Sequence, residues 1–147
     1  MIEHAIIIIA LSWILVKTLK TIIGWVKHRR IDLKIIFQDG GMPSMHTVLI
    51  VSLATAMILE TGLSAPSVIS IVLALIVIND SFKVRRVTGE QSRILNQITK
   101  SRGGNMDYEK HKKLSEHIGH TPAEVLVGLI LGILIPIIIY IIINAVL

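Results

Sequence analysis

Three polar clusters interrupt an otherwise apolar sequence, and each contains side chains that suit phosphate chemistry. They read "DGGMPSMHT" at residues 39–47, "NDSFKVRR" at residues 79–86 and "GHTPAEV" at residues 119–125. Together they supply two histidines, several cations and two expected helix starts. Such a set suits binding a phosphate group and attacking its phosphorus atom. Because the chain has no cysteine, the nucleophile would be a histidine.

The first cluster combines a turn with a helix start. Gly40 and Gly41 allow positive φ and a close approach of the backbone to a phosphate. Ser44 is expected to cap the helix that follows, which places His46 in the first turn of that helix. Free N–H groups at a helix start form an anion site. The alternative is a structural turn with a serine cap and a surface histidine.

The second cluster directly follows an apolar segment. Arg85 and Arg86 carry planar guanidinium groups that bind phosphate oxygens in a bidentate way. The alternative is that they and Lys83 only anchor the segment at the membrane surface. Asp80 argues against pure anchoring, because a carboxylate at the end of a span is costly unless it forms a pair or has a function.

The third cluster reads as the start of another helix. Thr121, Pro122 and Glu124 match a Thr-x-x-Glu capping box with proline at the first helical position. This structural role explains those three residues, and Thr121 is expected to support the site in this way. It does not explain His120. Glu124 lies one turn from His120, and a carboxylate that orients a histidine ring makes one ring nitrogen a better nucleophile or base.

Two lysines in the first apolar segment also bear on the site. Lys17 and Lys20 are three residues apart, so they share one helix face. Both are expected to extend towards the headgroups, or Lys20 could instead point inward to a polar site.

Four apolar segments are expected to position these clusters. They cover residues 5–26, 47–59, 68–78 and 125–147 of the 147-residue chain, whose mean hydropathy is +0.72. Spanning a bilayer takes about 20 helical residues, so the first and last segments suffice, whereas the middle two must recruit their polar flanks. The sequence therefore predicts an all-α, polytopic membrane helical bundle of about four transmembrane helices in one domain, residues 1–147. A soluble protein with buried helices is the alternative.

The basic residues predict the orientation of this bundle. Beyond the first segment, every Lys and Arg falls in residues 27–34 or 83–113, and the connection "ETGLSAPS" and both termini have none. The positive-inside rule makes the basic side, with all three clusters, cytoplasmic and puts both termini outside. The first segment is too long and too weakly basic at its start for a cleaved signal peptide.

The second basic stretch predicts two short cytoplasmic helices. "GEQSRILNQITK", residues 89–100, reads as an amphipathic helix whose apolar positions are Ile94, Leu95 and Ile98. "SRGGN" ends it, and "DYEKHKKLSEHIG", residues 107–119, reads as a second, polar helix. Their charges are expected to be solvated or to contact anionic lipid headgroups.

The motifs "GGMPSMHT", "NDSFKVRRVTGEQSRILN" and "GHTPAEVLVG", in this order and spacing, resemble the divergent branch of the type 2 phosphatidic acid phosphatase superfamily. That branch is related to acid phosphatases and vanadium-dependent haloperoxidases, and the resemblance covers nearly the whole chain. It implies a metal-independent membrane hydrolase of lipid or polyprenyl phosphates that works through a phosphohistidine, without a cofactor.

The resemblance also implies roles for the histidine motifs. "PSMH" matches the superfamily's Pro-Ser-Gly-His motif with Met45 in place of glycine, so Ser44 would be a phosphate ligand and His46 the general acid. "HTPAE" matches the end of its Ser-Arg-x5-His-x3-Asp motif, with Glu124 in place of aspartate. His120 would then be the nucleophile, and Glu124 would hold its ring.

Two cationic positions of the superfamily pattern have no local match. The arginine of the third motif is not five residues ahead of His120, so Arg85 or Arg86 would supply it from a distance. The first motif, Lys…Arg-Pro, has no Arg-Pro counterpart, and Lys20 is the expected equivalent of its lysine.

Other functions remain open on the residues alone. The same pocket would serve a non-catalytic protein that binds or translocates phospholipids, and a structural membrane subunit would use the clusters only as caps and anchors. A metal site from His46, His120, Glu124 and Asp80 is conceivable, but no local ligand spacing supports it, so no metal is expected. The expected partners are membrane lipids, a lipid phosphate and a second copy of the chain in a homodimer, with no nucleic acid.

Overall fold

The computed structural model describes residues 2–28, 41–101, 114–115 and 119–146. Every element in these ranges is helical, and the structure is an all-α membrane bundle, as predicted. The elements are α1 (Ile2–His28), α3 (Met45–Thr61), α4 (Ala65–Asn79), the π-helix η1 (Asp80–Val84), α5 (Arg85–Ser101) and α6 (Pro122–Val146).

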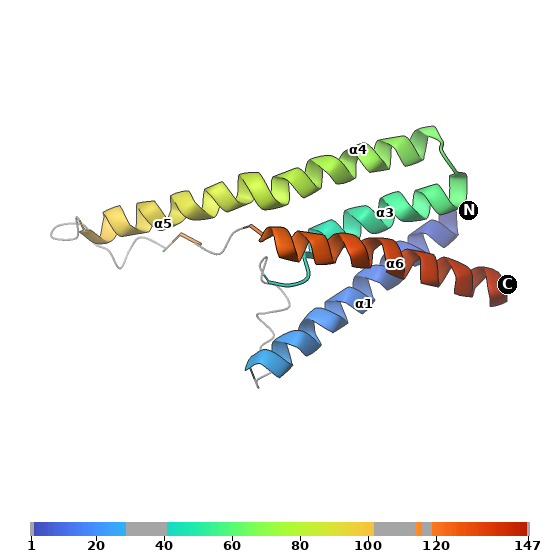
Figure 1. The fold of residues 1–147 in the computed structure, drawn as a ribbon, viewed down its shortest axis with the longest axis horizontal. Helices are drawn as coiled ribbons and strands as arrows, with labels where there is room; N and C mark the ends of the chain where they lie inside the picture. The colour runs from blue at the N-terminus through green and yellow to red at the C-terminus, as the bar shows by residue number, and fades with distance from the viewer. Residues whose placement is uncertain (1, 29–40, 102–113, 116–118, 147) are drawn as a thin grey trace.

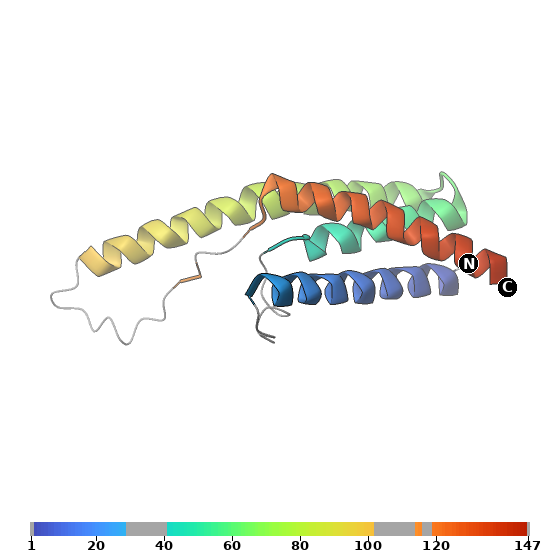
Figure 2. The same ribbon diagram turned by 60° about the horizontal axis from the view of Figure 1, so that its bottom comes forward.

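Helix α3 is the centre of the bundle. It packs against α1, α4 and α6. Figure 1 shows that α1 and α3 run in opposite directions, and Figure 2 shows α1 lying along the bundle beneath α3 and α6. Both chain termini and the α3–α4 turn lie at one end. The starts of α3 and α6 and the end of α4 lie at the other end, so the three polar clusters converge there.

Two glycines let α6 pack closely on α3. A Cβ atom on Gly128 would lie 2.9 Å from the carbonyl oxygen of Ser44, and one on Gly132 would lie 2.8 Å from Cβ of Val51. Their spacing is that of a G-x-x-x-G motif, which brings helix backbones together in membranes. This contact fixes the start of α6 beside the start of α3.

The surface of the bundle is apolar in a way that suits lipid rather than water. The apolar stretches His4–Val26 and Pro122–Ala145 are each long enough to cross a bilayer, and only 22% of the most apolar 18 residues in each is buried. Large side chains such as Ile7, Leu15 and Ile138 are about half exposed. A soluble protein would bury such residues. Helices α3 and α4 are shorter apolar helices, as their sequences predict.

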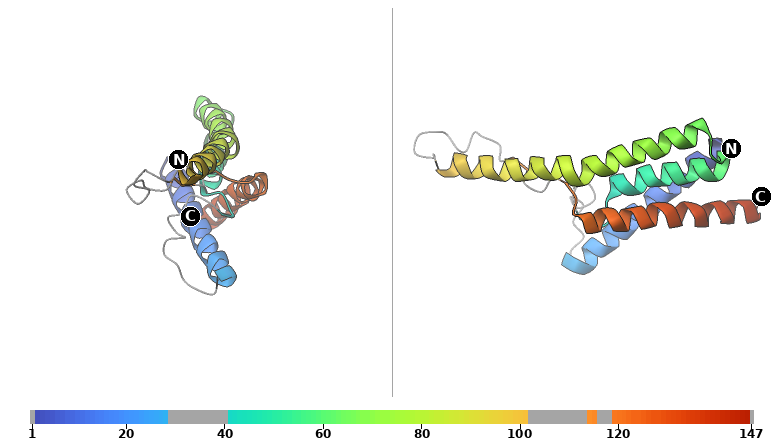
Figure 3. Two further views of the ribbon diagram at one scale, coloured as in Figure 1. Left: turned by 90° about the vertical axis from the view of Figure 1, so that its left-hand side faces the viewer. Right: turned by 45° about the horizontal axis from the view of Figure 1, so that its top comes forward.

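Helices α4, η1 and α5 form one continuous rod from Ala65 to Ser101. Figures 1 and 3 show α5 extending this rod beyond the ends of α3 and α6. The amphipathic helix expected at residues 89–100 is present, but it begins earlier and has no break from the third apolar segment. Its apolar residues Ile94, Leu95 and Ile98 are exposed.

The prediction of a second polar helix at residues 107–119 is wrong for the residues of that range that the structure describes. Leu114 and Ser115 are not helical. The Asn96 side chain donates to the carbonyl oxygen of Leu114 at 2.9 Å and accepts from its amide at 3.1 Å. Because Asn96 engages both backbone groups of Leu114, they are not in helical hydrogen bonds. The rest of that range, except Gly119, lies outside the described residues.

Candidate functional site

His120 is oriented by Glu124 at the start of α6. Nδ1 of His120 lies 3.1 Å from Oε2 of Glu124, and the His120 side chain is only 2% exposed. A carboxylate in this position accepts the proton of Nδ1, which leaves Nε2 as the nitrogen with a free lone pair. That nitrogen is the one able to bond phosphorus or take a proton.

The same carboxylate oxygen also caps the helix. The Thr121 amide donates to Oε2 of Glu124 at 3.1 Å, and the Glu124 amide donates to Oγ1 of Thr121 at 3.3 Å. These two bonds are the predicted capping box, with Pro122 as the first helical residue. One oxygen of Glu124 therefore serves both the helix start and the histidine ring.

The backbone around His120 is held by the α4–η1–α5 rod. The His120 amide donates to the Ser81 carbonyl at 3.0 Å. Gly119 has φ +97°, and a Cβ atom there would lie 2.6 Å from the Arg86 nitrogen. Only glycine fits such a close approach at positive φ. The wide π-turn at Asp80–Val84 contains the carbonyl that accepts the His120 amide, and such turns recur at functional sites.

His46 lies close to His120 although 74 positions separate them in the chain numbering. Their ring centroids are 6.2 Å apart, with the ring planes tilted by 56°. His46 is the second residue of α3 and is partly exposed, whereas His120 is buried. Two helix starts thus bring together the histidines of the first and third clusters.

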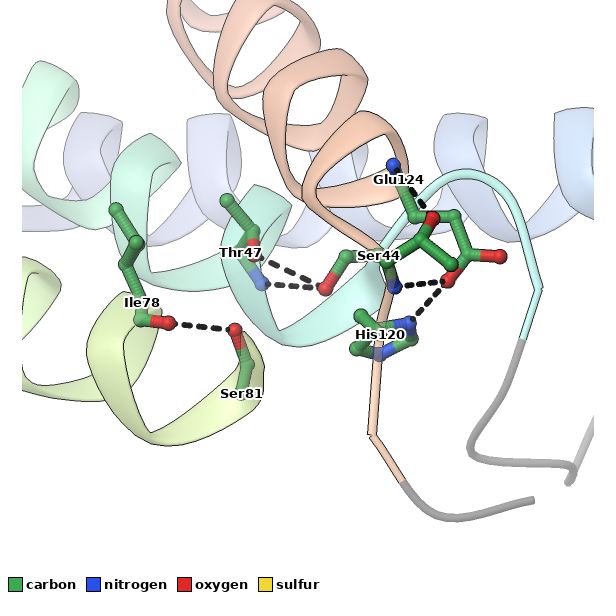
Figure 4. A network of polar contacts seen from close by, with 7 residues as sticks. Ser44, Thr47, Ile78, Ser81, His120 and Glu124 are labelled. Atoms are coloured by element: carbon green, nitrogen blue, oxygen red, sulfur yellow. Dashed lines mark hydrogen bonds and ion pairs between the residues drawn. The ribbon is translucent and has the colours of Figure 1, made fainter. Parts of the chain in front are cut away.

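Ser44 caps α3 as predicted. Its Oγ accepts a hydrogen bond from the Thr47 amide at 3.4 Å and another from Oγ1 of Thr47 at 2.9 Å. The Ser44 amide donates to the Glu124 carbonyl at 3.2 Å, which ties the starts of α3 and α6 directly. Ser44 and Thr47 are both fully buried. Figure 4 shows this serine beside His120 and Glu124.

The two candidate arginines lie on the rod and form ion pairs along it. Nε of Arg85 donates to Oδ2 of Asp80 at 3.0 Å, across the π-turn. Nε of Arg86 lies 3.7 Å from Oε1 of Glu90, and both of these side chains are more than half exposed. Asp80 therefore has the ion-pair partner that its position requires. The backbone of Arg85 and Arg86 contacts Gly119, next to His120.

The two lysines of α1 have different surroundings. Lys20 is 7% exposed, and a Cβ atom on Gly41 would lie 3.9 Å from its Cε, so Lys20 points inward to the first cluster. Gly41 has φ +91°, a conformation that favours glycine. Nζ of Lys17 lies 4.3 Å from the ring centroid of Trp13, a cation–π contact.

Three features of the site were not predicted from the sequence. Ser81 holds the His120 amide, Thr47 completes the polar contacts of Ser44, and Gly128 lets α6 approach Ser44. The G-x-x-x-G spacing of Gly128 and Gly132 was a readable signal for the last of these. Within the described ranges, no group of three or more His, Cys, Asp or Glu side chains is arranged to hold a metal ion.

Comparison with known proteins identifies the family of the chain. A family profile described as "Divergent PAP2 family" matches residues 1–135. A protein of Bacillus subtilis (strain 168), described as "Uncharacterized membrane protein YuiD", is 34% identical over 132 residues, which cover 82% of this chain and 84% of that protein. No solved structure matches the chain significantly.

Proposed function

Because the chain belongs to the divergent PAP2 family, we propose that it is a membrane phosphatase of lipid or polyprenyl phosphates that acts through a phosphohistidine. One observation carries this proposal. Glu124 holds Nδ1 of the buried His120 at 3.1 Å, and the ring of a second histidine, His46, lies 6.2 Å away. A nucleophile and a general acid on one phosphate require such a pair.

In the first step, Nε2 of His120 attacks phosphorus and forms an N–P bond. The bond from phosphorus to the lipid oxygen breaks, and its electron pair leaves on that oxygen. His46 in its protonated form gives the leaving alkoxide a proton, so the lipid departs as an alcohol. Glu124 stabilises the positive charge that develops on the His120 ring.

In the second step, water attacks the phosphorus of the phosphohistidine. His46, now neutral, accepts a proton from that water, and the N–P bond breaks. Inorganic phosphate is released, and His120 returns with its Nδ1 proton still directed at Glu124. The sum of the two steps is a hydrolysis of the phosphate ester, and no oxidation or reduction is involved.

The surroundings supply positive potential for the phosphate. The N-termini of α3 and α6 both lie at the histidine pair, and helix N-termini favour anions. Lys20 adds a buried ammonium beside Gly41. Arg85 and Arg86 are the remaining candidate phosphate ligands. To bind phosphate, Arg85 exchanges the carboxylate of Asp80 for a phosphate oxygen.

The membrane orientation is part of the same proposal. Helices α1, α3, α4 and α6 each cross the bilayer, α3 and α4 with the help of their polar ends. The site end is cytoplasmic, and both termini are outside. The arrangement of both termini and the α3–α4 turn at one end supports this topology, as do the basic residues of α5 at the other end. The site then meets the phosphate of a lipid whose tail stays in the bilayer.

The deciding experiment measures phosphate release from a panel of lipid and polyprenyl phosphates by purified wild type and His120→Ala in bilayer discs. Wild type should release phosphate with EDTA present, and His120→Ala should not. Equal release by both proteins contradicts the phosphohistidine. If neither releases phosphate from any substrate, a protein that binds or translocates phospholipids becomes the better description of this site.

A further inference from the structure

A shallow apolar hollow opens on the outer side of the bundle between α1 and α3. Its volume is about 390 Å³, and it is lined by Ile6, Ile9, Ala10, Trp13 and Leu49. All five side chains are apolar or aromatic. Ile6, Trp13 and Leu49 are 40–60% exposed, so the hollow faces outward, where the bundle meets lipid.

One end of this hollow leads towards the candidate site. Leu49 lies one turn after His46 on α3. On α1, the ammonium of Lys17 contacts the Trp13 ring, and Lys20 lies one turn further in the same direction. Because α1 and α3 run in opposite directions, the two lysines and His46 lie at the same end of the hollow. The other end, at Ile6, points to the chain termini.

We propose that this hollow binds one hydrocarbon chain of a lipid phosphate whose phosphate lies at the His46–His120 pair. The inference rests on the proposed function for the position of that phosphate. An all-apolar lining fits an acyl or prenyl chain and not a headgroup. The cations Lys17 and Lys20 lie at the His46 end of the hollow. They would direct the phosphate of an anionic lipid to that end and its hydrocarbon chain to the other.

The dimensions favour one chain. Helices α1 and α3 pack directly against each other, so the hollow lies along their contact, and its volume of about 390 Å³ suits one hydrocarbon chain. A diacyl lipid would leave its second chain in the bilayer. Because bilayer hydrocarbon is as apolar as the hollow, binding gains little from removing water, and its selectivity comes from packing and from the cations. The hollow therefore holds one chain of a lipid phosphate, and a second chain, where the lipid has one, stays in the bilayer.

The chain provides its own probe for a test. It has two tryptophans, and Trp25→Phe leaves Trp13 as the only one. This variant is placed in phosphatidylcholine discs with an alkyl phosphate that carries bromine at mid-chain, which quenches tryptophan fluorescence on contact. Quenching should saturate at a mole fraction of bromoalkyl phosphate about tenfold lower than the mole fraction of equally brominated phosphatidylcholine that gives the same quenching. This tenfold preference corresponds to about 1.4 kcal/mol. The corresponding bromoalkyl alcohol should lack this preference.

Two variants of α1 provide a matched comparison. Ala10→Phe puts a ring into the hollow and should abolish the tenfold preference. Leu11→Phe adds a ring at an exposed position outside the hollow and should leave it intact. If the bromoalkyl phosphate quenches no better than brominated phosphatidylcholine, or if Ala10→Phe keeps the preference, the hollow is not a chain-binding site.

Phosphate release, measured on the same proteins, separates this inference from the proposed function. Preferential quenching without release contradicts hydrolysis and supports the hollow as a lipid-phosphate site. Release without preferential quenching supports hydrolysis and overturns the hollow. Where both hold, Ala10→Phe should raise the KM for long-chain phosphates by about tenfold, while the KM for a short, water-soluble phosphate should stay unchanged.

Discussion

Gly119 lies against the backbone of Arg86 so closely that a Cβ atom on it would be 2.6 Å from the Arg86 nitrogen. The next residue, His120, is bonded through its amide to Ser81 in the same rod. The position of the candidate nucleophile is therefore set by backbone contacts between the residues just before α6 and the α4–η1–α5 rod, and not by its own side chain alone.

Gly119→Ala should displace His120. The new Cβ atom meets backbone that cannot move aside, and a displacement of about 1 Å at a reacting group costs about 10²-fold in rate. Phosphate release should fall by that factor. Gly62→Ala is the control, because Gly62 also has positive φ but has nothing within 4 Å of a Cβ atom. Both variants should lose about 1–3 kcal/mol of stability, and only Gly119→Ala should lose activity. Equal activities would contradict the positioning role.

The two histidines should differ in their dependence on the leaving group. His120→Ala should reduce release to background with every substrate, because it removes the nucleophile. His46→Ala should slow lipid phosphates by about 10²–10⁴-fold, the usual contribution of a general acid. With nitrophenyl phosphate the loss should be much smaller, because that leaving group needs no proton. A uniform loss across both substrate types would exclude His46 as the acid.

Glu124→Gln separates ring orientation from helix capping. Glutamine serves a capping box as well as glutamate does, so thermal stability should stay near that of the wild type. Turnover should fall at least about tenfold, because a neutral amide cannot stabilise the charged ring. Thr121→Ala is the counterpart. It removes the Oγ1 acceptor of the Glu124 amide and should cost about 1 kcal/mol of stability with a smaller effect on turnover.

The proposed topology is open to cysteine labelling, since the chain has no cysteine of its own. Position 63 lies in the α3–α4 turn and is 87% exposed, and Arg93 is exposed on α5. Leu63→Cys should react with a membrane-impermeant reagent only from outside, and Arg93→Cys only from the cytoplasmic side. The reverse pattern would place the site outside the cell.

The sequence predicted the parts of the site that depend on local rules. The capping box at Thr121 and Glu124 and the serine cap at Ser44 follow from spacing alone. Residue types and the one-sided basic charge also led to the pairing of the two histidine motifs. The bond from His120 to Ser81 could not be predicted, because it depends on how two helices pack. The π-turn could not be predicted either, since the sequence of Asp80–Val84 is typical of the end of a membrane span. Only the spacing of the ion pair between Asp80 and Arg85, five residues apart, is consistent with a wider turn.

The shared oxygen of Glu124 links the folding of helix α6 to the ordering of the His120 ring. The atom that completes the first turn of α6 is the atom that holds the His120 ring. Once α6 is capped, the ring is already ordered, so no separate loss of rotational freedom accompanies substrate binding at this residue. Preorganisation of this kind comes with the helix itself.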